Sequence, residues 1–229
     1  MMRSLRSYQC GQSMFEFNMS LPFLTPIILV VMMLVVQWAF LFSAKSTLDA
    51  ATVKAVREGA INYGSMSAIN RGLTEGMMPL YNHGTGIGDI VSAYTRARTA
   101  VGLLGRVTIL NPNEEVFNKF KVEIYYGRDR HQEIPNDNLM YRSTALTQLS
   151  DERQINLQDA NLLQIEVQWC QKMVVPFANS VIENVVSSGL LFNPSAQQLR
   201  CNALGQASGD KYLAMTSQGL MRMQTPFRQ

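Results

Sequence analysis

LPFLTPIILVVMMLVVQWAFLF, from Leu21 to Phe42, is a run without a formal charge, and Gln37 is its only strongly polar side chain. A helix needs about 20 consecutive apolar residues to cross the hydrocarbon core of a bilayer. A helix of this length that is apolar on every side is unusual as the core helix of a small domain. The run therefore predicts one membrane-spanning helix. Pro22 and Pro26 disturb its backbone hydrogen bonding and predict a kink or local melting near its start.

The residues on either side of this run predict its orientation. Arg3 and Arg6 precede it, and no acidic residue occurs before Glu16. Short basic flanks stay in the cytoplasm, so the long C-terminal part is expected on the opposite side of the membrane. Ala44 and Lys45 lead directly into a charged helical pattern instead of a signal-peptide cleavage site, so the apolar helix is expected to stay attached.

Composition argues against several classes of protein. The chain has 229 residues, of which 47% are hydrophobic and 16% charged, so it can bury one substantial core and is not a disordered chain. Its formal net charge is only +3, and no cluster of Lys and Arg suggests nucleic acid as a partner. His83 and His131 are the only histidines, and neither lies in a metal-ligand spacing. No GxSxG motif is present. We therefore expect no enzyme activity, no cofactor and no metal, and a dispersed active site is the minor alternative.

The junction between the basic leader and the apolar run reads CGQSMFEF, from Cys10 to Phe17. Four residues separate a glycine from Glu16, which an aromatic residue follows immediately before the helix. This arrangement resembles the prepilin-peptidase site of type IV pilins. The resemblance implies cleavage after Gly11, which would make Gln12 the mature N-terminus and Glu16 the fifth mature residue.

Longer stretches are similar to the TadE-like family of the tight-adherence (Flp, type IVc) pilus system. The strong part covers about Gly11 to Gly64 and contains LPFL at Leu21 to Leu24 and AKSTLDAATVKAVREGA at Ala44 to Ala60. Weaker similarity continues at Ile134 to Ser143, Leu162 to Val186 and Gly219 to Pro226. Phe17 stands where the major pilins of this system usually carry Tyr. The resemblance therefore implies a minor pilin or pseudopilin.

This family resemblance implies a role for Glu16 and Phe17 in assembly. An acid in an apolar helix costs up to about 3 kcal/mol at the bilayer centre and less near the surface. In pilins the carboxylate pairs with the free amino terminus of a neighbouring subunit, an ion pair that a low dielectric strengthens. A carboxylate that only reaches to the membrane interface is the alternative.

The resemblance also implies partners, location and function. The expected partners are other pilins and pseudopilins, the prepilin peptidase, the inner-membrane assembly platform and the lipid bilayer. The chain is expected to cross the bacterial inner membrane once, with a periplasmic C-terminal domain, and to act in pilus assembly, surface adhesion and biofilm formation. The competing interpretation is an unprocessed single-pass membrane protein whose periplasmic domain binds envelope partners.

The predicted organisation is a leader at residues 1–11, an N-terminal helix over 12–80 and a periplasmic α+β domain over 81–229. Beyond the membrane this helix carries a stripe of mostly small residues, which can pack on the protein's own sheet or on another subunit. The stripe consists of Ala44, Leu48, Ala51, Ala55 and Gly59. The pairs Lys45–Asp49 and Lys54–Glu58 have i,i+4 spacing. Glycines at 64, 72 and 76 predict interruptions, and Pro79 predicts an end near Met78.

The C-terminal part predicts helices packed on a small antiparallel sheet. Residues 82–89 (NHGTGIGD) are interpreted as a loop, because they lack the Lys-Ser/Thr ending of a phosphate-binding loop. Asp89 can cap the helix that follows, and Gly105 can end it. Strands are expected at 106–110, 122–126, 163–175 and 211–224. A helix is expected from Pro176 to about Ser188, with Gly189, Asn193 and Pro194 punctuating the connection that follows it. Most of 114–161 is interpreted as loop, whose acids do not have the spacing of a calcium loop.

Three cysteines occur in the chain. Cys10 would be lost with the leader, which leaves Cys170 and Cys201 on the oxidising side of the membrane. A disulfide between these two is expected, and two buried reduced thiols are the alternative.

Overall fold

The computed structural model describes residues 12–187 and 195–228. The leader at residues 1–11, with Gly11, lies outside the described residues. The same holds for Gly189, Asn193 and Pro194, which were expected to punctuate the connection after the helix at 176–188.

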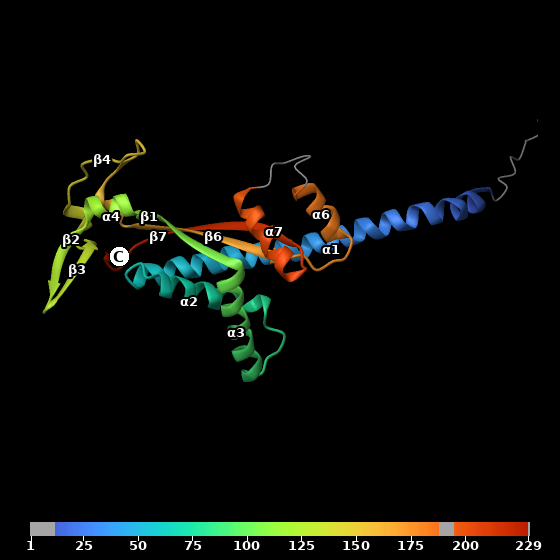
Figure 1. Cartoon of the computed structure of the whole chain (residues 1–229), viewed down its shortest axis with the longest axis horizontal. Helices are drawn as coiled ribbons and strands as arrows, with labels where there is room; N and C mark the ends of the chain where they lie inside the picture. The colour runs from blue at the N-terminus through green and yellow to red at the C-terminus, as the bar shows by residue number, and fades with distance from the viewer. Residues whose placement is uncertain (1–11, 188–194, 229) are drawn as a thin grey trace, which may run out of the picture.

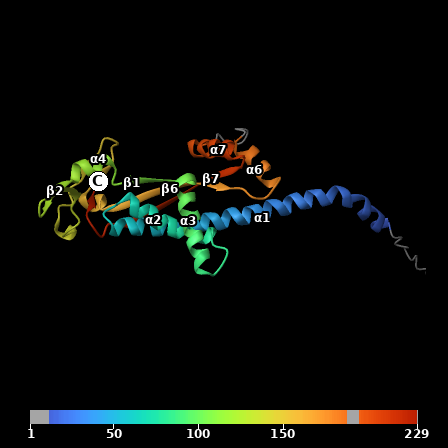
Figure 2. The same cartoon turned by 60° about the horizontal axis from the view of Figure 1, so that its bottom comes forward.

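A single long helix, α1 (Gln12–Ile61), runs from the N-terminal end into the body of the molecule. Figure 1 shows about half of α1 projecting away from the remaining elements. Pro22 and Pro26 lie inside α1, and the chain stays helical through both, so the expected local melting is wrong. Figure 2 shows α1 bending toward its N-terminal end, as helices do near proline.

The chain reverses direction after Ile61. Tyr63 and Gly64 have positive φ values of 58° and 74°, and the Gly64 N–H donates to the Gly59 carbonyl at 2.9 Å. Helix α2 (Met66–Met77) then folds back along α1, and a short 3-10 turn, η1 (Met78–Leu80), follows it. The expected helix to Met78 is therefore two helices.

Of the three predicted glycine interruptions, only the one at Gly64 is confirmed. Gly72 and Gly76 lie within α2, where a Cβ on either would come within about 3 Å of Ala55 or Ala51 in α1. These two glycines let the helices approach closely instead of interrupting them.

Ion pairs along α1 reflect this fold-back. Lys45 pairs with Asp49 at 2.5 Å, as predicted. Lys54 instead pairs with Glu75 of α2 at 2.7 Å. Glu58 likewise pairs with Arg71 of α2 at 3.5 Å. The expected Lys54–Glu58 pair is wrong, because α2 places an opposite charge beside each residue.

The main sheet has three antiparallel strands in the order β1-β6-β7. These are β1 (Gly105–Asn111), β6 (Leu162–Lys172) and β7 (Tyr212–Arg222). Val107 lies opposite Val167 in β1 and β6, and Val167 lies opposite Ser217 in β7. All three strands were predicted. Helix α3 (Ile87–Leu104) precedes β1 and ends at Gly105, as expected.

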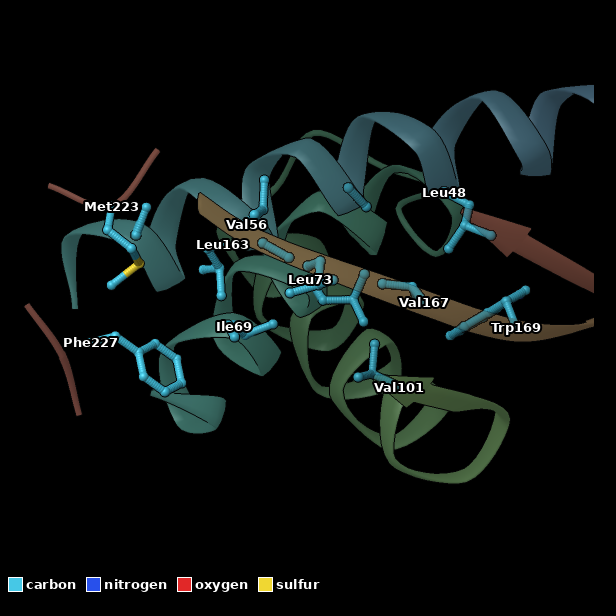
Figure 3. Close-up of a cluster of buried hydrophobic side chains, with 14 of the residues drawn as sticks. Leu48, Val56, Ile69, Leu73, Val101, Leu163, Val167, Trp169, Met223 and Phe227 are labelled. Atoms are coloured by element: carbon cyan, nitrogen blue, oxygen red, sulfur yellow. The ribbon is translucent and has the colours of Figure 1, made fainter. Parts of the chain in front are cut away.

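The core lies between one face of this sheet and helices α1 and α2. Leu163, Ile165, Val167 and Trp169 alternate along β6 and are all buried. Figure 3 shows Leu163, Val167 and Trp169 facing side chains of the helices, including Leu48 and Val56 from α1 and Ile69 and Leu73 from α2. The stripe of small residues on α1 is buried in this core, so it packs on the protein's own domain.

The opposite face of the sheet carries α7 (Ala196–Ser208), which contacts β7 and β6. The Ser195 side chain accepts the Gln198 N–H at its start, and Gly209 with φ 75° ends it. The sequence interpretation placed a connection here, which is wrong. Helix α6 (Ala178–Ser187) agrees with the predicted helix and lies beside α1.

Residues 114–161 form several short elements, so the loop interpretation is largely wrong. They are α4 (Glu114–Phe120), β2 (Val122–Tyr126), β3 (Asp129–Ile134), η2 (Leu139–Tyr141), β4 (Thr147–Gln148), β5 (Gln154–Ile155) and α5 (Leu157–Ala160). The strand predicted at 122–126 is confirmed. It pairs with β3, and β3 pairs with the C-terminal β8 (Phe227–Arg228). Two local pairings, β2–β3 and β4–β5, and one distant pairing, β3–β8, order this region.

Candidate functional site

The N-terminal half of α1 carries the residues that the sequence singled out. Gln12 is its first residue, and the side chains of Glu16 and Phe17 are exposed near its start. Apolar side chains from Met14 to Val36 are mostly exposed on every side of the helix. Gly11 cannot be placed relative to them, because it precedes the described residues.

Helix α1 is a candidate membrane anchor. It is the one helix among the described residues that is long and apolar enough to cross a membrane. The core helix of a soluble protein or a signal sequence can be equally long and apolar. A core helix is mostly buried, however, whereas only 17% of the most apolar stretch of α1 is buried in this protein. The exposed apolar surface needs another apolar environment.

Gln37 marks the point where α1 enters the folded body. Its side chain is 0% exposed although it lies inside the apolar run. Its Oε1 accepts the backbone N–H groups of Val174 at 3.2 Å and Val175 at 2.8 Å. Its Nε2 is buried and has no hydrogen-bond partner within the described parts of the chain. Gln37 thus fixes the segment after β6 to the apolar helix by two hydrogen bonds.

The segment bound to Gln37 leads into α6. Phe177 takes a left-handed φ of 63°, and Ala178 begins the helix one residue later. One side of α6 is bonded to the domain through Lys211, which donates to Ser180 Oγ at 2.9 Å and pairs with Glu183 at 2.5 Å. Helix α6 is therefore held between α1 and the start of β7.

The expected disulfide is present. Cys170 on β6 and Cys201 on α7 are bonded, with their Cα atoms 5.4 Å apart. Side chains alternate along a strand, so Cys170 points away from the face that Trp169 presents to the core. This bond fixes α7 on the second face of the sheet.

A buried charge pair closes the far end of the domain. Glu133 on β3 is almost fully buried and accepts hydrogen bonds from Arg228 Nε at 2.8 Å and the Tyr126 hydroxyl at 3.1 Å. The Arg228 guanidinium also lies 4.0 Å from the centre of the Tyr63 ring. Burial works against the charge of Arg228, but the hydrogen bond and the charge of Glu133 raise its pKa. The penultimate residue thus joins β8 to the turn between α1 and α2.

Polar groups elsewhere in the domain form no metal site within the described residues, because no group of three His, Cys, Asp or Glu side chains there is close enough to hold a metal ion. The open hollow between α2 and α3 is lined by Arg71, Arg98 and Tyr94, together with the polar side chains of Ser67, Asn70 and Thr74. The candidate site is therefore α1 itself, from Glu16 to the junction at Gln37.

Comparisons of the chain with protein-family models, with curated proteins and with solved structures find no match. The geometry itself defines a mixed α+β protein with small antiparallel sheets and a long apolar N-terminal helix.

Sequence reasoning predicted the cysteine pair and noted the polarity of Gln37, and the role of Glu16 and Phe17 in assembly stays a prediction. Sequence reasoning missed the partners of Gln37, the Glu133–Arg228 pair and α7. Partners that lie 95 to 138 residues apart along the chain leave no local pattern. The spacing of Val181 and Val185 was a usable signal, because it places two apolar residues on one helical face.

Proposed function

We propose that this chain is a minor pilin or pseudopilin similar to the TadE-like family, acting in assembly of a tight-adherence (type IVc) pilus and so in surface adhesion and biofilm formation. The division of α1 into two halves carries the proposal. The half up to Val36 exposes apolar side chains all round, whereas Leu41 to Ala60 packs into the chain's own domain. Such a helix can lie in a bilayer, and then against neighbouring subunits, while its domain stays folded.

Glu16 supplies the chemistry of assembly in this proposal. Cleavage after Gly11 creates a free amine at Gln12, about 6 Å along the helix axis from Glu16. The carboxylate of one subunit pairs with the amine of its neighbour in surroundings of low dielectric. An unprocessed chain has no amine at this position, so processing controls the ion pair.

The disulfide is consistent with a periplasmic domain. Disulfides form and persist in oxidising compartments and are rare in the cytoplasm. Cys170 and Cys201 both follow α1, so one crossing of the inner membrane by α1 puts both on the oxidising side. Basic residues before the span favour this orientation. The partners are then other pilins, the prepilin peptidase and the assembly platform.

Mass spectrometry of the mature N-terminus in the native host tests this function. A polypeptide that begins at Gln12 is expected. Glu16→Ala is expected to be processed but to enter pili poorly, because it removes the carboxylate. Asp49→Ala is the matched control, since Asp49 is an exposed acid on the same helix beyond the apolar run. Functional pili formed with an uncut Met1, or normal assembly of Glu16→Ala, would contradict the proposal.

An unprocessed, single-pass membrane protein with a partner-binding domain is the second candidate. Large apolar and aromatic side chains are exposed in the segment from β2 to the start of β4, namely Tyr125, Met140, Tyr141 and Leu146. Figure 1 shows β2 and β4 at the end of the domain away from the N-terminal half of α1. Such a surface suits binding to another protein. An intact leader in the mature protein, together with loss of a co-purifying envelope protein in Tyr141→Ser, would favour this candidate.

A further inference from the structure

The position of α6 relative to the apolar run is unexpected for an element outside the membrane. The turn before α6 contacts α1 at Gln37, five residues before the run ends at Phe42. At a rise of 1.5 Å per residue, this point lies about 7.5 Å inside the end of the run. If the run lies in a bilayer up to Phe42, the turn and α6 reach the same depth.

The surface that this segment presents is apolar. Val174 is 65% exposed and Phe177 is 70% exposed, and Val181 and Val185 on α6 are exposed as well. Val181 and Val185 are four residues apart on α6, so they lie on one face of the helix, and Phe177 immediately precedes its first residue. In water this face would be unfavourable for a small helix.

The opposite side of α6 is polar and already has partners. Ser180 and Glu183 are bound by Lys211 at the start of β7. These bonds fix the rotation of α6 and leave its apolar face pointing away from the domain. Trp38 on α1 is exposed one residue beyond Gln37. Tryptophan is enriched where helices cross the membrane interface.

We propose that α6 and the turn before it, residues 174–187, lie in the interface of the bilayer that α1 crosses, with lipid covering Val174, Phe177, Val181 and Val185. Interfacial amphipathic helices insert their apolar face about 5 to 10 Å, which includes the depth set by Gln37. The apolar surface of α1 continues into this face, so one lipid environment covers both. The inference rests on the membrane span proposed above, but not on cleavage after Gly11.

In this arrangement α6 fixes the height and tilt of the domain at the membrane. A single helix anchor leaves the domain free to tilt about the point where it leaves the bilayer. A second apolar contact beside it removes that freedom. The domain is thereby held so that Glu16 lies at the opposite end of the span.

Quenching by lipid nitroxides tests the depth of α6. The full chain carries Cys10→Ser, so that an environment-sensitive dye labels one introduced cysteine while Cys170 and Cys201 stay oxidised. Val181→Cys and Val185→Cys report on the apolar face of α6. Ile87→Cys is the matched control, because Ile87 is an exposed apolar residue at the start of α3. Each labelled protein is placed in nanodiscs that contain phospholipid with a nitroxide near the headgroup or deep in the acyl chain.

The expected result is strong loss of fluorescence at Val181 and Val185 with the shallow nitroxide, and no loss at Ile87. Val30→Cys, in the middle of the apolar run, reports separately on the span and should be quenched by the deep nitroxide. Quenching at Val30 without quenching at Val181 and Val185 overturns the inference and leaves the span intact. Absence of quenching at Val30 overturns the span and the inference together. Crosslinking of Val181→Cys to a second chain without lipid quenching assigns this face to a protein neighbour and also overturns the inference.

Discussion

Gly76 of α2 lies directly against Ala51 of α1, and a Cβ added to Gly76 would come within 2.5 Å of the Ala51 Cα. The Ala51 Cα is a backbone atom and cannot rotate away as a side chain could, so the helices would have to separate. Overpacking of this kind costs about 1 to 3 kcal/mol. The gain in helix propensity from Gly to Ala is about 1 kcal/mol at most. Close packing should therefore outweigh propensity at this position.

We accordingly expect Gly76→Ala to lower the free energy of unfolding by up to about 2 kcal/mol. Gly102→Ala on α3 is the matched control, because a Cβ there meets no atom within 4 Å. It should raise stability by about 0.4 to 1 kcal/mol. Denaturant unfolding of the chain in detergent micelles measures both values. A stabilised Gly76→Ala would show that α1 and α2 are farther apart than described.

Replacement of Gln37 by Leu should loosen the junction between α1 and α6. The substitution keeps the volume and the apolar character of the span, but it leaves the Val174 and Val175 N–H groups without their acceptor. An unsatisfied buried group costs about 1 to 3 kcal/mol. Amide hydrogen exchange at Val175 should then become roughly 10- to 100-fold faster, since 1.4 kcal/mol corresponds to a factor of ten.

Thr47→Val is the control for Gln37→Leu. The Thr47 hydroxyl donates to the Ser43 carbonyl of the same helix, so its loss should leave exchange at Val175 unchanged. Equal exchange rates in Gln37→Leu and the parent protein would mean that water or another group satisfies these amides.

Removal of the disulfide should destabilise the domain. The bond closes a loop with a sequence separation of 31 residues, for which the chain-entropy model gives about 3 to 4 kcal/mol. We expect the double variant Cys170→Ser and Cys201→Ser to have a free energy of unfolding lower by this amount, and therefore to unfold at a lower denaturant concentration. Cys10→Ser should unfold like the parent protein. An unchanged midpoint in the double variant would show that the bond adds no net stability.

Arg228→Ala should destabilise the end of the domain that holds β8. Glu133 is 2% exposed and would lose its guanidinium partner. Removing one partner of a buried ion pair costs about 3 kcal/mol or more in stability. Arg130→Ala is the comparison, because its pair with Glu123 is exposed and should contribute about 1 kcal/mol or less. Thermal unfolding of the two variants should differ clearly, and similar losses would argue against burial of Glu133.

Acid should weaken the contact between α4 and the segment that holds β4 and β5. The Ser150 hydroxyl and backbone N–H donate to Glu115 at 2.7 and 2.8 Å, and these bonds lower the pKa of Glu115. A lowered folded pKa gives stability that is present above the unfolded value near 4.5 and is lost as the pH falls through the folded value. The difference in Tm between the parent and Glu115→Gln should shrink below about pH 4.5. A difference that is constant from pH 7 to pH 3 would contradict this assignment.

Elements with a strong local pattern were predictable, and contacts between side chains on distant segments were not. The alternation of Ile165, Val167 and Trp169 predicted β6, because every second side chain of a strand lies on the same face of the sheet. The charges of Lys54 and Glu58 predicted a pair within α1, but α2 supplied nearer partners. Sequence spacing identifies only partners within one helix. The fold-back at Gly64 places Glu75 and Arg71 of α2 beside these residues.

The candidate site divides in the same way. The cysteine pair was predicted and is present, whereas the role of Glu16 in assembly stays a prediction. Gln37 stands out in the sequence as the only strongly polar residue of the apolar run, but its acceptor role depends on a turn at 174–175 that no pattern near residue 37 reveals. Helix α7 was missed because its buried residues, Gln198, Cys201 and Gly205, have helical spacing but include no large apolar side chain.

The bond between β6 and α7 also affects how the chain responds to proteases. Any single backbone cut between residues 171 and 200 leaves two fragments that are still covalently linked. The nicked molecule would migrate as one species until a reductant separates it. Helix α6 lies in this interval, so a cut within it would leave the two parts of the domain joined.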